Sequence, residues 1–359
     1  MRAASRRAFL AALPALCRAA DVLPSESKKL RDPATEFELT RLTDPTFNSW
    51  LIAPPARSVT GRSTSLVYCS DRDGSLQVFR LDLKTGVSRQ ITAATQLDRT
   101  TVALLPDERT VCYFDGDQLV LASGARPRPL YRVESGWQRG KAFTVTDDGN
   151  HALFAEAQNG KYRMRLVTLG RGAATTILES DTEIVFIRPR PRRASILYGK
   201  PDSLWLVEFS GSNDRKLRTP EGSPAQALWL ADGKSFSYLR IPPAAGELHE
   251  LREHTPDANE DKRIAPTSQF ITFTRNSDAS VFAGVSRNQG SPYILLLLRV
   301  ARREMTVAEH RARDPRDVTV LFTPNSQRLL WSTNREGKSA IYSLAVEKFV
   351  EETEESENY

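Results

Sequence analysis

The stretch Ser65–Thr92, SLVYCSDRDGSLQVFRLDLKTGVSRQIT, predicts three short strands joined by two tight turns. The strands are rich in apolar and β-branched residues, and the turns contain Asp73-Gly74 and Thr85-Gly86. Such pairs are typical of tight connections, because these residues tolerate the positive φ that the turn needs. A small meander of this kind cannot bury both of its faces alone, so we expect it to pack against similar sheets.

A short polar turn before an apolar strand recurs at a regular distance along the chain. Five copies combine Pro, Asp or Asn with Asp, Ser or Gly, and two weaker copies fit the same spacing. The repeated positions are Gly61, Asp107, Asp148, Arg192, Asp232, Asp278 and Asn325, which are 40 to 47 residues apart. A four-stranded propeller blade takes about 40–45 residues. The sequence therefore predicts an all-β fold, a seven-bladed β-propeller.

The last repeat, LLWSTNREGKSAIYSLAV, matches the first one closely but ends without an outer strand. The segment Glu36–Thr43, near the beginning of the chain, has the strand alternation that is missing there. We expect this N-terminal strand to complete the seventh blade and to close the ring, which would leave only short, protected sheet edges.

The segments outside the repeats predict an exported protein. Residues 1–19 have the charged and apolar regions of a signal peptide, with Arg6-Arg7 resembling a twin-arginine signal. A lipoprotein anchor at Cys17 is the alternative. We interpret residues 20–35 as a linker, 36–346 as the propeller and 347–359 as an acidic C-terminal tail. The predicted location is periplasmic or extracellular.

Charge and composition narrow the classes of partner. The formal charge of +6 falls to +2 without the four arginines of residues 1–19, which argues against a nucleic-acid partner. The sequence contains no run of 18 or more apolar residues, so no transmembrane segment is predicted. Cys69 and Cys112 should face opposite ways on adjacent blades, so no disulfide is expected. The basic run Arg188–Arg193 is interpreted as a solvated turn, with a patch for an acidic sugar as the alternative.

Basic and aromatic residues fall where the innermost strands should begin, beside the central channel. Guanidinium groups pair with carboxylates in a bidentate manner. Arg99, Arg139 and Arg188 are therefore candidates for binding an acidic sugar, with ordinary blade surface as the alternative. Trp137 could stack on a sugar ring or pack between blades.

Several phrases of the sequence resemble the oligogalacturonate lyase family, a branch of the TolB-like, WD40-like propellers. They include Arg41-Leu42-Thr43, Asp82–Gly86, Gly136-Trp137-Gln138 and Phe322–Asn325, and the resemblance covers nearly all of residues 36–346. It implies cleavage of short pectin-derived oligogalacturonates by β-elimination. It also implies a manganese-type divalent ion, held by histidines and a glutamine, and a further histidine as base.

The chain lacks the family's histidines at the positions where the resemblance places the metal ligands and the base. The resemblance places the base histidine at Gln226 and the metal histidines at Thr272, Asp317 and Thr319. If a metal site remains, Thr272, Asp317 and Thr319 would supply its oxygen ligands. Lys141 is the candidate for a substitute base, and Gln226 is the second catalytic candidate. The histidines that the chain does contain are expected on the surface; they are His151, His249, His254 and His310.

Two hypotheses of different classes follow. The first is a lyase-like propeller that binds short uronate oligosaccharides or other small acidic sugars, and cleaves them if a base and a metal are in place. The second is a non-catalytic TolB-like propeller that acts as a periplasmic scaffold or receptor for a protein partner. The absence of the expected histidines favours the second hypothesis, and the length of the resemblance favours the first.

Overall fold

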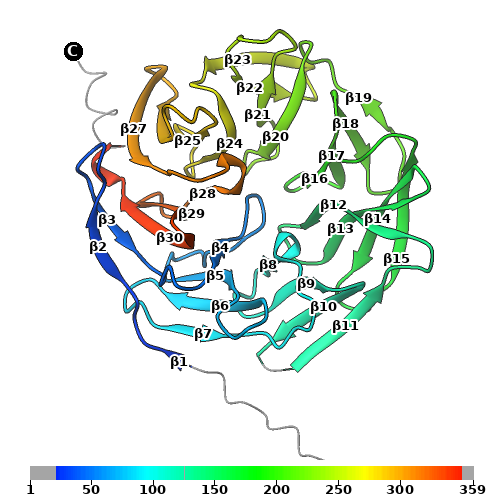
Figure 1. Cartoon of the computed structure of the whole chain (residues 1–359). Helices are drawn as coiled ribbons and strands as arrows, with labels where there is room; N and C mark the ends of the chain where they lie inside the picture. Colours follow the sequence, from blue (N-terminus) through cyan, green and yellow to red (C-terminus); the bar gives the residue numbers. More distant parts are fainter. Residues whose placement is uncertain (1–21, 125, 350–359) are drawn as a thin grey trace, which may run out of the picture.

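Seven antiparallel sheets surround a common axis in the computed structural model, which describes residues 22–124 and 126–349 (Figure 1). The prediction of a seven-bladed all-β propeller is confirmed. The predicted signal peptide, and residues 350–359 of the predicted tail, lie outside the described residues. Among the residues described, no helix has the length and apolar composition needed to cross a membrane.

Five blades contain four strands that follow one another from the axis outward, and blades 1 and 7 each have a fifth, outermost strand from the N-terminal segment. Blades 1 to 3 consist of β4 (Ser49–Leu51), β5 (Ser65–Ser70), β6 (Gln77–Asp82) and β7 (Ser88–Gln90); β8 (Ala103–Leu104), β9 (Val111–Asp115), β10 (Gln118–Ser123) and β11 (Arg126–Arg132); and β12 (Gln138–Val145), β13 (His151–Gln158), β14 (Lys161–Thr168) and β15 (Ala174–Ser180). Blades 4 and 5 consist of β16 (Phe186–Pro189), β17 (Ser195–Lys200), β18 (Ser203–Glu208) and β19 (Arg215–Lys216); and β20 (Ser223–Trp229), β21 (Phe236–Ile241), β22 (Glu250–Thr255) and β23 (Glu260–Pro266).

Blade 6 consists of β24 (Phe270–Arg275), β25 (Val281–Ser286), β26 (Tyr293–Leu298) and β27 (Arg303–Glu309). Blade 7 consists of β28 (Thr319–Phe322), β29 (Arg328–Glu336), β30 (Lys338–Ala345) and the N-terminal strand β3 (Glu38–Arg41). Two short 3-10 helices, η1 (Arg99–Thr101) and η2 (Pro315–Asp317), precede the innermost strands of blades 2 and 7.

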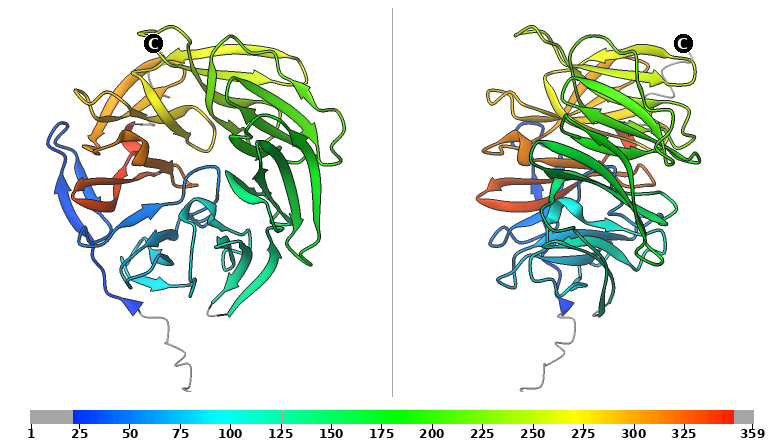
Figure 2. Two further views of the ribbon diagram at one scale, coloured as in Figure 1. Left: turned by 45° about the vertical axis from the view of Figure 1, so that its right-hand side comes forward. Right: turned by 90° about the vertical axis from the view of Figure 1, so that its right-hand side faces the viewer.

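The ring closes through the N-terminal segment, as predicted. Strand β3 pairs antiparallel with β30, with Thr40 opposite Ser343 and Arg41 opposite Tyr342. Figure 2 shows this segment along the outer rim of the ring. Pairing across the two ends of the chain covers the exposed edge of the last blade, because the edge groups of β30 find backbone partners.

The predicted linker differs from the structure, because residues 20–35 also contribute strands. Strand β2 (Lys28–Arg31) extends blade 7 beyond β3, and β1 (Val22–Leu23) extends blade 1 beyond β7. Directly after β2, the buried Asp32 carboxylate accepts hydrogen bonds from the backbone N–H groups of Thr35 (3.2 Å) and Glu309 (3.0 Å). This segment is therefore fixed to blades 6 and 7 by pairing and by a buried acceptor.

The seven predicted turns all join the first and second strands of a blade. In six of them the third turn residue has a positive φ, between 56° and 71°, yet only Gly149 and Gly233 are glycines there. At Gly233 a Cβ would lie 2.3 Å from the carbonyl oxygen of Pro191 in the neighbouring turn. Glycine is thus required where one turn packs on the next, and other residues accept the left-handed conformation elsewhere.

One interpretation of a charged segment needs correction. Arg190, expected in a solvated turn, is buried; it donates to the carbonyl of Gly233 (2.6 Å) and pairs with Asp257 (2.7 Å). The basic run is therefore partly an internal tie between blades 4 and 5.

The core consists of apolar layers that fill the space between adjacent blades. The largest fully buried side chains are aromatic, and the Trp331 and Tyr342 rings stack with centroids 5.8 Å apart. Cys69 and Cys112 are buried, free thiols that belong to two different layers: Cys69 faces blade 2 and Cys112 faces blade 3. Both side chains therefore point toward the following blade, and the prediction that they face opposite ways is wrong.

Candidate functional site

The innermost strands all run in one direction along the axis, so the channel has two distinct mouths. We call the mouth where β12, β20, β24 and β28 begin the strand-start end, and the mouth at the turns 147–150, 231–234 and 276–279 the anchor end. The predicted metal and catalytic residues belong to strands or to η2 near the strand-start end. The structure brings some of these residues into contact and separates others.

Gln226 and Thr272 do meet, but in a contact that engages both the oxygen and the nitrogen of the glutamine amide. The Thr272 hydroxyl (2.9 Å) and the Phe273 N–H (3.0 Å) donate to Oε1 of Gln226, and its Nε2 donates to the Phe273 carbonyl (3.0 Å). Gln226 is 8% exposed. Its amide therefore pairs with the free backbone edge of β24 and ties blade 5 to blade 6, because buried edge groups need partners.

The remaining predicted ligands are poor in charge. Asp317 is exposed in η2, which lies against β24, and Thr319 begins β28. A transition metal favours imidazole or several carboxylates, whereas these positions offer one carboxylate and neutral hydroxyls. Within residues 22–124 and 126–349, no group of three or more His, Cys, Asp or Glu side chains could hold a metal ion. The residues present do not fit the predicted manganese site.

The basic candidates of blades 2 and 3 lie at the strand-start end with partners of their own. Arg139 pairs with Asp98, and burial alone would raise the Asp98 pKa, but hydrogen bonds from Thr100 and Arg139 hold that pKa below its usual range. The Arg99 guanidinium lies 5.1 Å from the centroid of the Trp50 ring. Lys141 is 83% exposed and lies 3.5 Å from a Glu183 oxygen. Their predicted roles in binding and catalysis stay predictions.

Trp137 and Arg188 occupy different surroundings from those expected for one sugar site. The Arg163 guanidinium covers the Trp137 ring at 3.9 Å from its centroid. Arg188 donates from Nε to the carbonyl of Ala227 (3.0 Å) and lines a cavity at the anchor end, away from Arg139 and Lys141. Arg188 therefore does not share one binding surface with Arg139 and Lys141, and Arg163 covers one face of the Trp137 ring.

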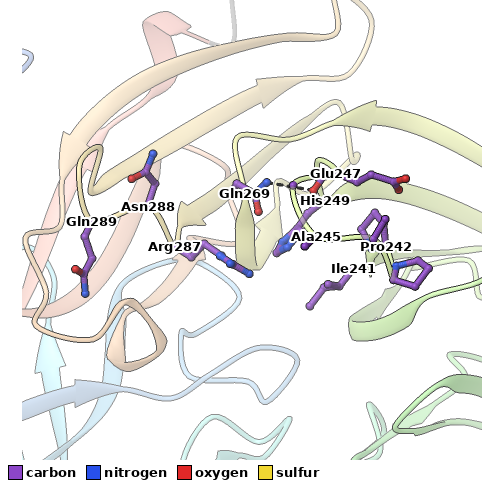
Figure 3. Close-up of a pocket in the computed structure, with 12 residues that line it drawn as sticks. Ile241, Pro242, Ala245, Glu247, His249, Gln269, Arg287, Asn288 and Gln289 are labelled. Atoms are coloured by element: carbon purple, nitrogen blue, oxygen red, sulfur yellow. Dashed lines mark hydrogen bonds between the residues drawn. The ribbon is translucent and has the colours of Figure 1, made fainter.

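A cavity of about 670 Å³ opens at the strand-start end between blades 5 and 6 (Figure 3). Its walls are the loop 242–249, which follows β21, and residues 287–289, which follow β25. Arg287, Gln269 and Asn288 contribute polar groups, and Pro242 and Ile241 contribute apolar surface. The volume and the mixed lining are typical of small-molecule sites in proteins.

His249 lies in this cavity, although the sequence predicted a surface histidine. It is 3% exposed, and its Nδ1–H donates to the carbonyl of Phe270 (2.5 Å), so Nε2 keeps a lone pair. Burial lowers the pKa of the imidazole, the Phe270 carbonyl opposes this shift, and the positive charge of Arg287 adds to it. A neutral imidazole beside a guanidinium can accept a proton next to a bound carboxylate.

The other histidines also depart from the expectation of surface residues. His254 and His310 are fully buried, and only His151 is partly exposed. His310 accepts from the Ala312 N–H at Nδ1 (3.1 Å) and donates from Nε2 to the Ser286 carbonyl (3.1 Å). No period or spacing in the sequence distinguishes these positions, because the burial comes from loops and outer strands that fold back on the blade.

The fold and this mouth of the channel define the class of protein: a seven-bladed β-propeller with a polar cavity at one end of its axis. The chain is 20% identical over 370 residues to an oligogalacturonate lyase of Dickeya dadantii, which covers 88% of this chain and 95% of that protein. It is 19% identical to an oligogalacturonide lyase of Pectobacterium atrosepticum, covering 90% and 97%.

Among solved structures, an oligogalacturonate lyase in complex with manganese matches with a TM-score of 0.85 and 19% identity, covering 91% of this chain and 97% of that one. A comparison with models of known protein families gives no match. The resemblance predicted from the sequence is confirmed: the homologues and structural neighbours are oligogalacturonate lyases. At this level of identity the structural likeness shows the fold, and a shared fold does not carry the activity with it.

Proposed function

We propose that this propeller binds short uronate oligosaccharides in the cavity between loop 242–249 and residues 287–289. Arg287 is exposed at the cavity wall and makes no ion pair among the described residues, so its guanidinium is available to a sugar carboxylate. The resemblance to oligogalacturonate lyases supports the same class of ligand. The twin-arginine-like segment supports an exported, periplasmic or extracellular protein.

The polar groups around Arg287 suit a sugar. Gln269, Asn288 and Gln289 line the same wall, and amides can both donate to and accept from hydroxyl groups. Apolar contact with Pro242 and Pro243 suits the less polar face of a sugar ring. The observation that carries the proposal is this combination of one unpaired guanidinium with several amides in a cavity of ligand size.

Calorimetric titration with trigalacturonate tests the proposal. Arg287→Gln should weaken binding at least tenfold, because a hydrogen bond to a charged group contributes about 1.5–3 kcal/mol. Arg302→Gln, at an exposed residue in the turn between β26 and β27, is the matched control and should leave binding unchanged. Equal affinity in wild type and Arg287→Gln, or equal affinity for the neutral sugar maltotriose, would overturn the proposal and favour a scaffold with a protein partner.

One observation favours a second candidate function, β-elimination without a metal. His249 is held neutral in the same cavity, with Nε2 as its free base nitrogen. In this reaction Nε2 takes the proton α to the uronate carboxylate, and Arg287 pairs with the carboxylate and stabilises the negative charge that develops on it. The electron pair of the broken C–H bond forms the C=C bond, and the glycosidic oxygen leaves and takes a proton from water.

Ultraviolet absorbance of the unsaturated product measures this activity. We expect activity that is the same with chelator and with added manganese, and that falls by roughly 10²–10⁴-fold in His249→Gln, as for loss of a general base. Lys141→Ala should retain the activity, which separates His249 from the base expected from the sequence. A flat absorbance trace with the wild-type protein would leave binding alone as the function.

A further inference from the structure

A second cavity of about 410 Å³ lies at the anchor end of the channel. It is lined by the last residues of the innermost strands and the turns that follow them, from blades 3 to 7 together with Pro55 of blade 1. Strand β24 separates the two cavities: Gln269 precedes its first residue and Arg275 is its last. At about 3.3 Å per residue, the two sites are roughly 20 Å apart.

Two arginines in this second cavity make no ion pair among the residues that the structure describes. Arg188 donates from Nε to Ala227 O (3.0 Å) and from Nη1 to Ile187 O (2.8 Å), and its Nη2 makes no hydrogen bond there. Arg275 donates from Nη2 to Trp229 O (2.6 Å) and from Nη1 to Asn276 O (3.1 Å) and Ser277 O (3.3 Å), while its Nε is buried without a partner. Both guanidinium groups therefore keep unused donors.

The surroundings make these positive charges expensive. Protein packed densely around Arg188 lowers its pKa to about 10, although the side chain keeps partial contact with the water of the cavity. Burial also lowers the pKa of Arg275, and the more distant Asp278 and Asp232 oppose that shift. A cation that has lost part of its hydration gains strongly from an anion that can reach it.

The other lining groups describe the kind of anion that would fit. The carboxylate among the lining residues is Asp147, which reaches solvent. Loss of hydration against the surrounding protein raises its pKa, Arg57 opposes this shift, and Asp148 adds to it. Thr144 and Ser277 offer hydroxyl groups, and Trp229 and several prolines offer apolar surface. The lining thus combines two cations and one anion with both polar and apolar contacts.

We propose that the anchor-end cavity is a second ligand site, which binds a small organic carboxylate through Arg188 and Arg275. Bidentate pairing with planar carboxylates suits guanidinium groups, and the Trp229 and proline surfaces suit the carbon skeleton of an organic anion. This site is separate from the uronate site proposed above, since neither arginine lines the first cavity.

The experiment is a calorimetric titration with citrate, carried out in the Arg287→Gln background so that the first cavity contributes no arginine. Arg188→Gln should weaken citrate binding at least tenfold, as for loss of a charged hydrogen bond. Asp147→Asn should tighten binding by about threefold, because it removes a like charge from the cavity. Asp147 is exposed, so this variant keeps the test valid if Arg188→Gln does not fold.

Intrinsic fluorescence gives an independent readout of the same site. Citrate should change the Trp229 emission, and the change should vanish in Trp229→Phe, because Trp229 lines the cavity and donates to Arg188 O (3.0 Å). Absence of citrate binding, or affinity that neither Arg188→Gln nor Asp147→Asn changes, would overturn the proposal. Binding of inorganic phosphate in place of citrate would overturn the carboxylate assignment.

Discussion

Strand β24 is tied to blade 5 at two places by different chemistry. In the middle of the strand, the oxygen and the nitrogen of the Gln226 amide bond the Phe273 N–H and carbonyl. At the end of the strand, the Arg275 guanidinium bonds the carbonyls of Trp229, Asn276 and Ser277, while its Nε has no partner. The same structural task is therefore performed by a neutral amide at one place and, at the other, by a cation that makes no ion pair among the described residues. Only the cation offers a positive charge to an anionic ligand.

Removal of the neutral tie should have the largest effect on stability. Gln226→Ala leaves the Phe273 N–H and carbonyl without partners in a buried position, and each unsatisfied group costs about 1–3 kcal/mol. We expect a loss of about 2–4 kcal/mol in the free energy of unfolding, measured by guanidinium denaturation. Gln289→Ala, at an exposed residue of the first cavity, is the matched control with little expected change. A small loss for Gln226→Ala would show that the tie is not structural.

This contact also shows why the fold could be predicted from the sequence while the site could not. Blade number follows from a period of 40 to 47 residues, and the closing strand follows from an alternation missing at one terminus and present at the other. Whether Gln226 is a catalytic group or an inter-blade tie depends on its alignment with the edge of β24, 46 residues away. Nothing local in the sequence encodes that alignment.

The recurring turns between the first and second strands of each blade illustrate the same limit within the fold. The two copies that looked weak are the blade-1 turn, where Ser63 adopts positive φ without glycine, and the blade-4 turn, which places its positive φ one residue earlier, at Arg192. The side-chain chemistry of the turn is variable, whereas its backbone geometry is nearly constant. His249 and Arg287 were missed for a related reason, since both belong to loops whose paths the repeat does not specify.

Glycine substitutions at the two mouths should separate a packed end from an open one. At the anchor end, Gly233→Ala places a Cβ 2.3 Å from Pro191 O in a turn with φ of 68°, so backbone strain and a clash combine to cost about 2–3 kcal/mol. Gly246→Ala, in the loop of the first cavity, has φ of 91° and open space, so strain alone should cost about 1 kcal/mol. Thermal unfolding of both variants measures the difference, and equal losses would contradict it.

Acid should weaken the fold through histidines that are buried in the neutral form. Burial lowers the pKa of His249, His254 and His310, so below the unfolded value of about 6.5 the unfolded chain binds protons that the folded chain does not. Stability is full above that pH and falls as pH decreases toward the folded values. Each unit of pKa difference corresponds to about 1.4 kcal/mol.

Urea denaturation between pH 7.5 and 5 measures the slope of the free energy of unfolding against pH. Variants and ligand then separate the contribution of His249, in the first cavity, from that of the histidines buried elsewhere. His254→Phe, which keeps a ring against Phe236, should reduce the slope with or without ligand. The contribution of His249 to the slope should become smaller with trigalacturonate, because a carboxylate in the first cavity favours the charged imidazole and so raises its pKa. If the ligand leaves the slope unchanged, the uronate does not reach His249.

The smallest expected effect concerns Lys141, the base candidate that the sequence favoured. Its side chain is 83% exposed and lies 3.5 Å from Glu183, and an exposed pair of this kind contributes at most about 0.5 kcal/mol because water screens it. Lys141→Ala should therefore leave stability unchanged by denaturation and leave trigalacturonate affinity unchanged by calorimetry. A tenfold loss of affinity would instead show that the sugar extends across the axis and contacts blade 3. Arg139 and the first cavity would then belong to one binding site.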